Sequence, residues 1–150
     1  MVGFTTYMDI ALDEARMAAA RGEVPVGAVL VSAGGDILAR AGNRTRELND
    51  PTAHAEVLVI REACATLGQE RLTGCELWVT LEPCPMCAMT ISAARIAKLV
   101  YGASDPKSGG IGQGPRIFDH PQAHHVPEVI DGVQENACAM LLKDFFAQRR

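Results

Sequence analysis

Two short motifs place three metal-binding side chains and one further carboxylate in this chain. The first is His54-Ala55-Glu56, and the second is Pro83-Cys84-Pro85-Met86-Cys87. Two cysteine thiolates separated by two residues can bind one Zn²⁺, and a histidine imidazole can supply a third bond. A single zinc ion bound by both motifs therefore requires a fold that brings His54 next to Cys84, although other elements separate them in the sequence.

The motifs supply three protein ligands, which is typical of a catalytic zinc site rather than a closed structural one. The open fourth position binds a water molecule, and zinc lowers the pKa of that water to about 7. Glu56 is not needed as a ligand, and it lies close enough to His54 in the sequence to transfer the proton of that water. The pattern H-x-E…P-C-x-x-C is the signature of zinc nucleobase deaminases.

A closed zinc knuckle is the structural alternative to a catalytic zinc site. It requires a fourth protein ligand, for which Cys64, Cys75 and Cys138 are the candidates. None of the three belongs to a second C-x-x-C or H-x-x-x-H pair, so this alternative has less support from the sequence.

The overall composition predicts one domain of 150 residues. The net charge of −4 argues against a large basic surface for nucleic acid, although it leaves room for a local basic cluster. We expect no signal peptide, because no basic region precedes an apolar run, and no transmembrane helix. An odd number of cysteines, two of them assigned to metal, favours a reducing compartment and hence the cytoplasm.

Helical and strand patterns alternate along the chain, which predicts an α/β domain with helices on both faces of the sheet. Gly22 is placed to end the first helix. The two helices in the middle of the chain begin at the metal motifs, so their positive N-terminal ends face one site. The predicted helices span residues 5 or 6 to 21, 51–67, 84–94 and 136–150, and the predicted strands span 24–31, 37–42, 77–81, 97–102 and 129–132.

The stretch 103–127 is rich in glycine and proline and is too long for a simple connection. Long ordered loops often bind ligands, so we expect a binding role for it. His120, His124 and His125 follow in the same stretch. They suggest a second metal site, but their spacing fits no standard ligand pattern, and loop histidines without a metal are the favoured interpretation.

Several stretches, some of which extend the metal motifs and some of which lie outside them, also carry information. They are residues 24–29, 42–44, 50–56, 79–84, 87–88, 101–107 and 144–150. Together they resemble the bacterial tRNA-specific adenosine deaminases of the cytidine deaminase-like superfamily. Guanine deaminases share residues 50–56 and 83–87, but tend to have Cys where this chain has Leu81.

The resemblance implies a three-layer α/β/α sandwich with a central mixed sheet of about five strands. It implies one zinc per subunit bound by His54, Cys84 and Cys87, with Glu56 as the proton shuttle. It also implies a homodimer that converts adenosine to inosine at the wobble position of a tRNA anticodon. The helix after Cys87, with Met86, Met89 and Ile91, is a candidate dimer contact, and core packing is the alternative.

Eight residues are expected to contact the substrate by the same resemblance. They are Asn43, Ala55, Asp105, Lys107, Phe145, Phe146, Arg149 and Arg150. The Asn43 amide can both donate to and accept from a base edge. A phenylalanine can stack on a flipped-out base, and an arginine can bind a phosphate. The alternatives are a turn residue for Asn43, a solvated loop for Asp105 and Lys107, and core packing or a frayed tail for the others.

Two other functions remain open at this stage. A deaminase of a free nucleobase or nucleoside, such as guanine or cytosine, would use the same zinc and glutamate. An RNA-binding module would keep the zinc only as a structural brace. The presence of Glu56 argues against the module, because a brace does not need a proton shuttle.

Overall fold

Five strands form one mixed sheet in the computed structural model, which describes residues 6–149. The strand order is β2-β1-β3-β4-β5. Strand β1 is antiparallel to both β2 and β3, whereas β3, β4 and β5 run parallel to one another. The strands are β1 (Gly27–Val31), β2 (Ile37–Gly42), β3 (Glu76–Leu81), β4 (Lys98–Ala103) and β5 (Glu128–Ile130).

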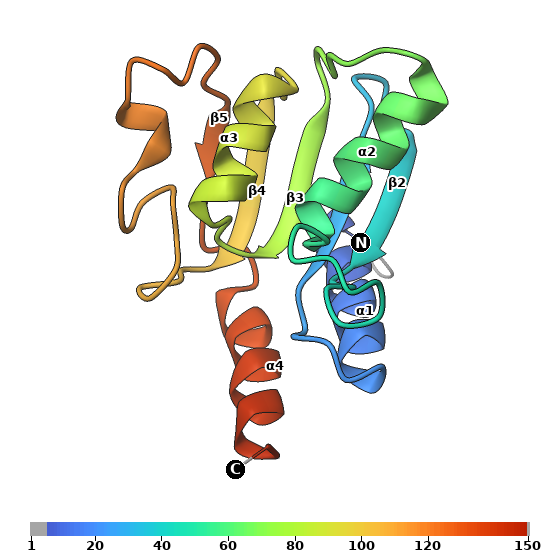
Figure 1. The fold of residues 1–150 in the computed structure, drawn as a ribbon, viewed down its shortest axis with the longest axis vertical. Coiled ribbons are helices and arrows are strands. Elements are labelled where there is room, and N and C mark those ends of the chain that lie inside the picture. Colours follow the sequence, from blue (N-terminus) through green and yellow to red (C-terminus); the bar gives the residue numbers. More distant parts are fainter. Residues whose placement is uncertain (1–5, 150) are drawn as a thin grey trace.

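Helices cover both faces of this sheet, as Figure 1 shows. The helices are α1 (Tyr7–Ala20), α2 (Ala55–Leu67), α3 (Pro85–Ala93) and α4 (Glu135–Ala147). Helices α2 and α3 pack on one face, and α1 and α4 pack on the other. The predicted three-layer α/β/α architecture with a five-stranded mixed sheet is therefore confirmed.

Alternate side chains of the strands enter two separate cores. Leu30, Leu77 and Leu99 pack under α2 and α3. Val29 and Val100 point the other way, toward α1 and α4. Because both faces are covered, the inner strands are apolar at nearly every position, which is typical of a sheet enclosed by helices.

Helix α1 lies very close to the sheet. Its N-cap is Thr6, whose hydroxyl accepts the Asp9 N–H while the Asp9 carboxylate accepts the Thr6 N–H. A Cβ atom at Gly27 would collide with the carbonyl oxygen of Ala11, so only glycine allows this approach. Arg21 caps the C-terminal end of the helix, and Gly22 follows with a positive φ, as the sequence predicts.

The first strand and the second helix begin later than predicted. Strand β1 starts at Gly27 rather than at residue 24, because Pro25 has no N–H for the ladder and Val26 turns back to bond the Val24 carbonyl. Helix α2 starts at Ala55 rather than at residue 51. The Asp50 carboxylate accepts both the N–H and the hydroxyl of Thr52, which holds Pro51 and Thr52 in a turn ahead of the helix.

The last two elements differ from the prediction by a few residues. Strand β5 covers Glu128–Ile130 and helix α4 covers Glu135–Ala147. Within the described part of the chain, no helix combines the length and apolar character needed to span a membrane.

Candidate metal centre

The three predicted metal ligands lie at the beginnings of α2 and α3. His54 is the N-cap of α2, Cys84 is the N-cap of α3, and Cys87 lies in the first turn of α3. Neither His54 nor Cys84 uses its side chain to cap its own helix, so both side chains are available for a metal. Pro85 at the first position of α3 fits a helix start, where an N–H is not needed.

The spacing of the ligand atoms fits tetrahedral zinc. His54 Nδ1 lies 3.6 Å from Cys84 Sγ and 3.4 Å from Cys87 Sγ. All three ligand atoms lie within 4.8 Å of one another. Zinc bonds of about 2.0–2.1 Å to nitrogen and 2.3 Å to sulfur, at a tetrahedral angle, place nitrogen and sulfur roughly 3.5 Å apart. The donor set is therefore placed to hold a zinc ion through Nδ1 of the imidazole and both sulfurs.

A fourth protein ligand is not present among residues 6–149. The group of potential ligands contains His54, Cys84 and Cys87 alone. Cys64 instead bonds the carbonyl of Glu70, and Cys138 packs in the core under α1 and α4. The arrangement of the described residues is that of an open zinc site, not of a closed knuckle.

The electrostatic surroundings favour the thiolate form of Cys84. Its hydrogen bonds with Cys87 and His54 outweigh burial and lower the pKa of Cys84 to about 4. The N-terminal ends of α2 and α3 both point at the site, and their partial positive charge stabilises anions there. Both effects stabilise the negatively charged sulfur, which is the form that binds a divalent metal ion.

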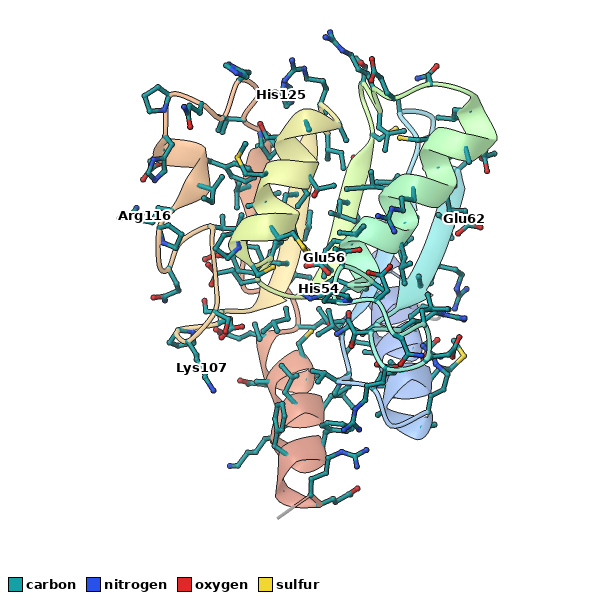
Figure 2. All side chains as sticks on the ribbon, viewed as in Figure 1. His54, Glu56, Glu62, Lys107, Arg116 and His125 are labelled. Carbon is teal, nitrogen blue, oxygen red and sulfur yellow. The ribbon has the colours of Figure 1, made fainter. Side chains whose placement is uncertain are left out.

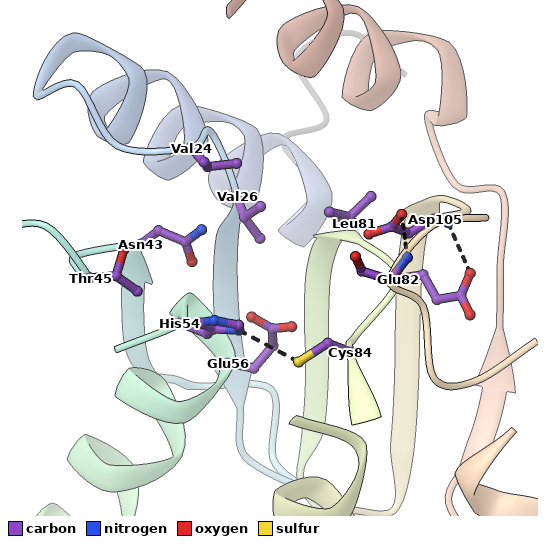
Figure 3. A pocket seen from close by; sticks show the side chains of 11 residues that line it. Val24, Val26, Asn43, Thr45, His54, Glu56, Leu81, Glu82, Cys84 and Asp105 are labelled. Atoms are coloured by element: carbon purple, nitrogen blue, oxygen red, sulfur yellow. Dashed lines mark hydrogen bonds between the residues drawn. The ribbon is translucent and has the colours of Figure 1, made fainter. Parts of the chain in front are cut away.

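Glu56 lies in the first turn of α2 with only 4% of its surface exposed. Figure 3 shows its side chain between His54 and Cys84, at the same cavity. Burial raises the pKa of the Glu56 carboxyl. A carboxyl group at this position can accept a proton and give it back, out of contact with bulk water.

A cavity of about 240 Å³ opens over these residues. Its size suits a ligand smaller than the drug-sized molecules that fill cavities of roughly 300–1,000 Å³. The residues that line it are Val24, Val26, Asn43, Thr45, His54, Glu56, Leu81, Glu82, Cys84, Asp105 and Ser108.

Asn43 lines this cavity and also caps α2. Its side-chain Oδ1 accepts the Ala55 N–H at 2.8 Å. This bond identifies the oxygen of the amide, so the NH₂ group is left to donate into the cavity. Ala55 itself is fully buried, and its N–H is used by Asn43. The roles of both residues in substrate binding stay predictions.

A second cavity of about 530 Å³ adjoins the first. Both share Val24, Leu81, Asp105 and Ser108, and the second is lined in addition by Ser104, Lys107, Leu142 and Phe146. Phe146 is 50% exposed. Figure 2 shows Lys107 projecting from its loop beside this region. These two side chains lie where a ligand extending out of the metal pocket would pass.

The side chains of three other predicted substrate residues have partners within the chain. Phe145 is buried, and the guanidinium of Arg149 lies 4.1 Å from the centre of its ring. The Asp105 carboxylate accepts the N–H groups of Lys107 and Ser108 and so shapes its own turn. The prediction for Arg150 lies outside the described residues.

The three histidines of the long loop do not gather into a site. A ring nitrogen of His120 bonds the carbonyl of Pro115 at 2.8 Å, and one of His125 bonds the carbonyl of Ile96 at 2.8 Å. Across residues 6–149, the one potential metal group is that of His54, Cys84 and Cys87. The favoured interpretation as loop histidines agrees with this arrangement.

Two buried glutamates near the cavity received no role from the sequence. Glu23 and Glu82 are 1% and 2% exposed, and both accept several backbone N–H bonds. Glu82 stands directly before Pro83-Cys84, which is a weak signal. The donors to both carboxylates come from distant loops, so sequence spacing alone does not reveal them.

Comparison with known proteins gives consistent results. Residues 4–103 match the family model described as "Cytidine and deoxycytidylate deaminase zinc-binding region". The chain is 58% identical over 146 residues to the tRNA-specific adenosine deaminase of Agrobacterium fabrum, covering 97% of this chain and 95% of that protein.

Two solved structures extend the comparison. One, reported as a study of "A-to-I Editing by tRNA:A34 Deaminases at the Wobble Position of Transfer RNA", superposes with a TM-score of 0.89 at 59% identity, covering 91% of this chain and 98% of that one. A guanine deaminase from Bacillus subtilis superposes with a TM-score of 0.65 at 34% identity, covering 99% and 94%. This chain is clearly more similar to the tRNA:A34 deaminase structure than to the guanine deaminase structure.

The first prediction concerns the metal. The purified protein should contain one zinc ion per chain by elemental analysis, because three donors already stand at zinc-binding distances. Cys87→Ser should lose most of this zinc, whereas Cys64→Ser, outside the site, should keep it. Full zinc content in Cys87→Ser would show that the ligands are misassigned.

Proposed function

The chain belongs to the tRNA-specific adenosine deaminases of the cytidine deaminase-like superfamily, and on this premise we propose that it hydrolyses adenosine to inosine at the wobble position of a tRNA anticodon. The observation that carries the proposal is the placement of Glu56 beside His54, Cys84 and Cys87 at one cavity. The high identity to a tRNA-specific adenosine deaminase over nearly the whole chain supports the choice of substrate.

His54, Cys84 and Cys87 would hold the zinc ion, which when bound would supply Lewis-acid activation of a water molecule for attack on C6 of the adenine. Glu56 accepts the proton of the attacking water and delivers it to ring nitrogen N1. The Glu56 carboxylate then takes up the second proton of the water, from the hydroxyl group now on C6, and gives it to the exocyclic amine; the C6–N bond breaks, the C6 carbonyl forms, and ammonia leaves. Nothing is oxidised or reduced, and the net reaction consumes one water. Because Glu56 is almost completely buried, the proton stays between the carboxyl and the substrate.

Asn43 orients the base in this proposal. Since its Oδ1 is bonded to the Ala55 N–H, its NH₂ group donates to an acceptor nitrogen of the purine ring. The bond to α2 also fixes the amide relative to Glu56, which lies in the first turn of the same helix. Ala55 contributes to binding through this contact.

The second cavity takes the neighbouring part of the RNA. The exposed ring of Phe146 offers a stacking surface for an adjacent base, and Lys107 offers a cation for a phosphate. Anticodon nucleotides already lie in a loop, so extruding one of them requires little unstacking energy. Asp105 shapes the turn that carries Lys107.

Deamination of a free base, such as guanine or cytosine, is the second candidate. The likeness to a guanine deaminase favours it, because the same fold supports that chemistry in a protein 34% identical to this chain. A free-base enzyme has no use for a second cavity open to Lys107 and Phe146. The two candidates therefore differ in what lies outside the zinc pocket.

The assembly and the compartment are also part of the proposal. Met86 and Met89 on α3 are 37% and 41% exposed, and a homodimer contact through this helix would cover them. A tRNA substrate and five free cysteines support a cytoplasmic protein.

Glu56→Gln should reduce kcat for tRNA by roughly 10²–10⁴-fold, because the amide cannot transfer the proton. The zinc content should remain one per chain, since Glu56 is not a ligand. Glu62→Gln, on the exposed side of the same helix (Figure 2), is the matched control and should keep full activity. A Glu56→Gln enzyme with near-normal kcat would remove Glu56 from the mechanism.

Lys107→Gln should raise the KM for tRNA and lower the salt dependence of binding by about one phosphate contact. Turnover of a small nucleoside should change little, because the metal centre is untouched. Lys98→Gln, which neutralises a lysine at the opposite end of β4, serves as the control. Equal tRNA affinity for the Lys107→Gln and parent proteins at every salt concentration would exclude this contact.

The dimer proposal predicts twice the chain mass by light scattering at micromolar concentration. Met89→Lys should shift the protein toward monomer, because a buried unpaired charge is costly at an apolar contact. Met140→Lys changes another exposed methionine, on α4, and should leave the dimer intact. A monomeric parent protein would refute the proposal.

A further inference from the structure

The two buried glutamates beside the cavity share an unusual environment. Glu23 and Glu82 are almost completely buried, and neither belongs to an ion pair within residues 6–149. We propose that both are positioning residues, each of which holds one loop of the pocket wall in its substrate-binding shape. The proposal deepens the proposed function and rests on it for its kinetic test.

Glu82 holds the loop that follows β4. Its Oε1 accepts the N–H of Asp105 at 3.0 Å. Its Oε2 accepts three further N–H groups at 3.0 Å each, from Ile111, Gly112 and Gln113. One carboxylate thereby ties Asp105, near the start of the loop, to residues 111–113, and between them Lys107 and Ser108 line the cavities.

The backbone of this loop packs directly on the carboxylate. A Cβ atom at Gly109 would lie 2.6 Å from Glu82 Oε2, and one at Gly110 would lie 2.6 Å from Pro85 N. The N–H of Gly110 also bonds the Pro83 carbonyl at 2.8 Å. The loop is thus seated on the segment that carries the first cysteine ligand, and glycine is needed for this approach.

Glu23 plays the equivalent part on the other wall. Its Oε2 accepts the Glu47 N–H at 2.8 Å, and its Oε1 accepts the Arg46 N–H at 3.2 Å and the Thr45 hydroxyl at 3.4 Å. Burial opposes these donors, but their combined effect lowers the pKa of Glu23, so the carboxylate is ionised at neutral pH. Thr45 lines the zinc cavity, two residues after Asn43.

Burying a carboxylate without a cationic partner is costly unless charged hydrogen bonds replace the lost water. For each glutamate, hydrogen bonds from the backbone N–H groups of a loop with little regular structure offset the free energy lost on burial. These bonds form only when the loop adopts this one arrangement. Both walls of the pocket are therefore formed before the substrate arrives, so binding does not need to order them.

The test uses isosteric variants of the full-length zinc enzyme. Glu82→Gln keeps the shape but replaces one acceptor oxygen with a donor, so it cannot satisfy both Asp105 and residues 111–113. If the loop is then correctly placed about a tenth of the time, the KM for tRNA rises about tenfold. We expect kcat to fall by less than about threefold, with zinc content unchanged.

Amide hydrogen exchange reports on each of the two loops separately, and it does not depend on enzyme activity. Amides 105–113 should exchange faster in Glu82→Gln while amides 45–47 keep their rate, and Glu23→Gln should give the reverse. Glu62→Gln, which removes an exposed carboxylate, should change neither loop nor KM. Unchanged exchange in the loop held by each substituted glutamate would overturn the proposal, even if the protein proves inactive on tRNA.

Gly109→Ala tests the same contact without changing the glutamate. Its new Cβ should push the loop off Glu82, raise the KM as Glu82→Gln does, and add little in the double variant, because both changes break one interaction. A parent enzyme inactive on tRNA refutes the proposed function alone. An active parent whose Glu82→Gln and Gly109→Ala variants keep its KM refutes the positioning role.

Discussion

The structure depends on one constraint: the N-terminal ends of two helices must meet at the same end of the sheet. His54 is the N-cap of α2 and Cys84 is the N-cap of α3. Because the two helices pack side by side on one face, His54 Nδ1 and Cys84 Sγ lie 3.6 Å apart. The same geometry directs two positive helix ends at the site and places Glu56 in the first turn of α2. The positions of the three potential metal ligands and of the proposed proton shuttle, and the favourable field, therefore follow from the packing of two helices.

Substrate recognition is built from less regular parts around this rigid centre. Asn43 connects the loop after β2 to the start of α2, so the amide that we propose binds the base is fixed to the helix that carries Glu56. Buried carboxylates hold the flanking loops, and the second cavity extends the pocket past Phe146. Zinc chemistry alone would serve any member of the superfamily. What surrounds the zinc cavity decides whether a free base or a nucleotide within RNA is deaminated.

Much of this could be predicted from the sequence, for physical reasons that differ between residues. The metal motifs could be recognised because tetrahedral coordination limits the spacing of ligands along a chain. The strands could be recognised because a sheet covered on both faces has apolar residues at nearly every position. The start of α2 was predicted wrongly because the Asp50 side chain competes with helix formation. The donors to Glu82 come from residues 23 to 31 positions away, and only the folded loop brings them to it.

The most direct test of the account is to compare substrates side by side. Ammonia release by the zinc-loaded enzyme would be measured with tRNA, adenosine, guanine and cytosine at equal concentration, with inosine quantified in the digested tRNA. The account predicts efficient release from tRNA, one inosine per molecule at the wobble position, and little release from the three small compounds. Efficient deamination of free guanine or cytosine, with tRNA left unchanged, would contradict it.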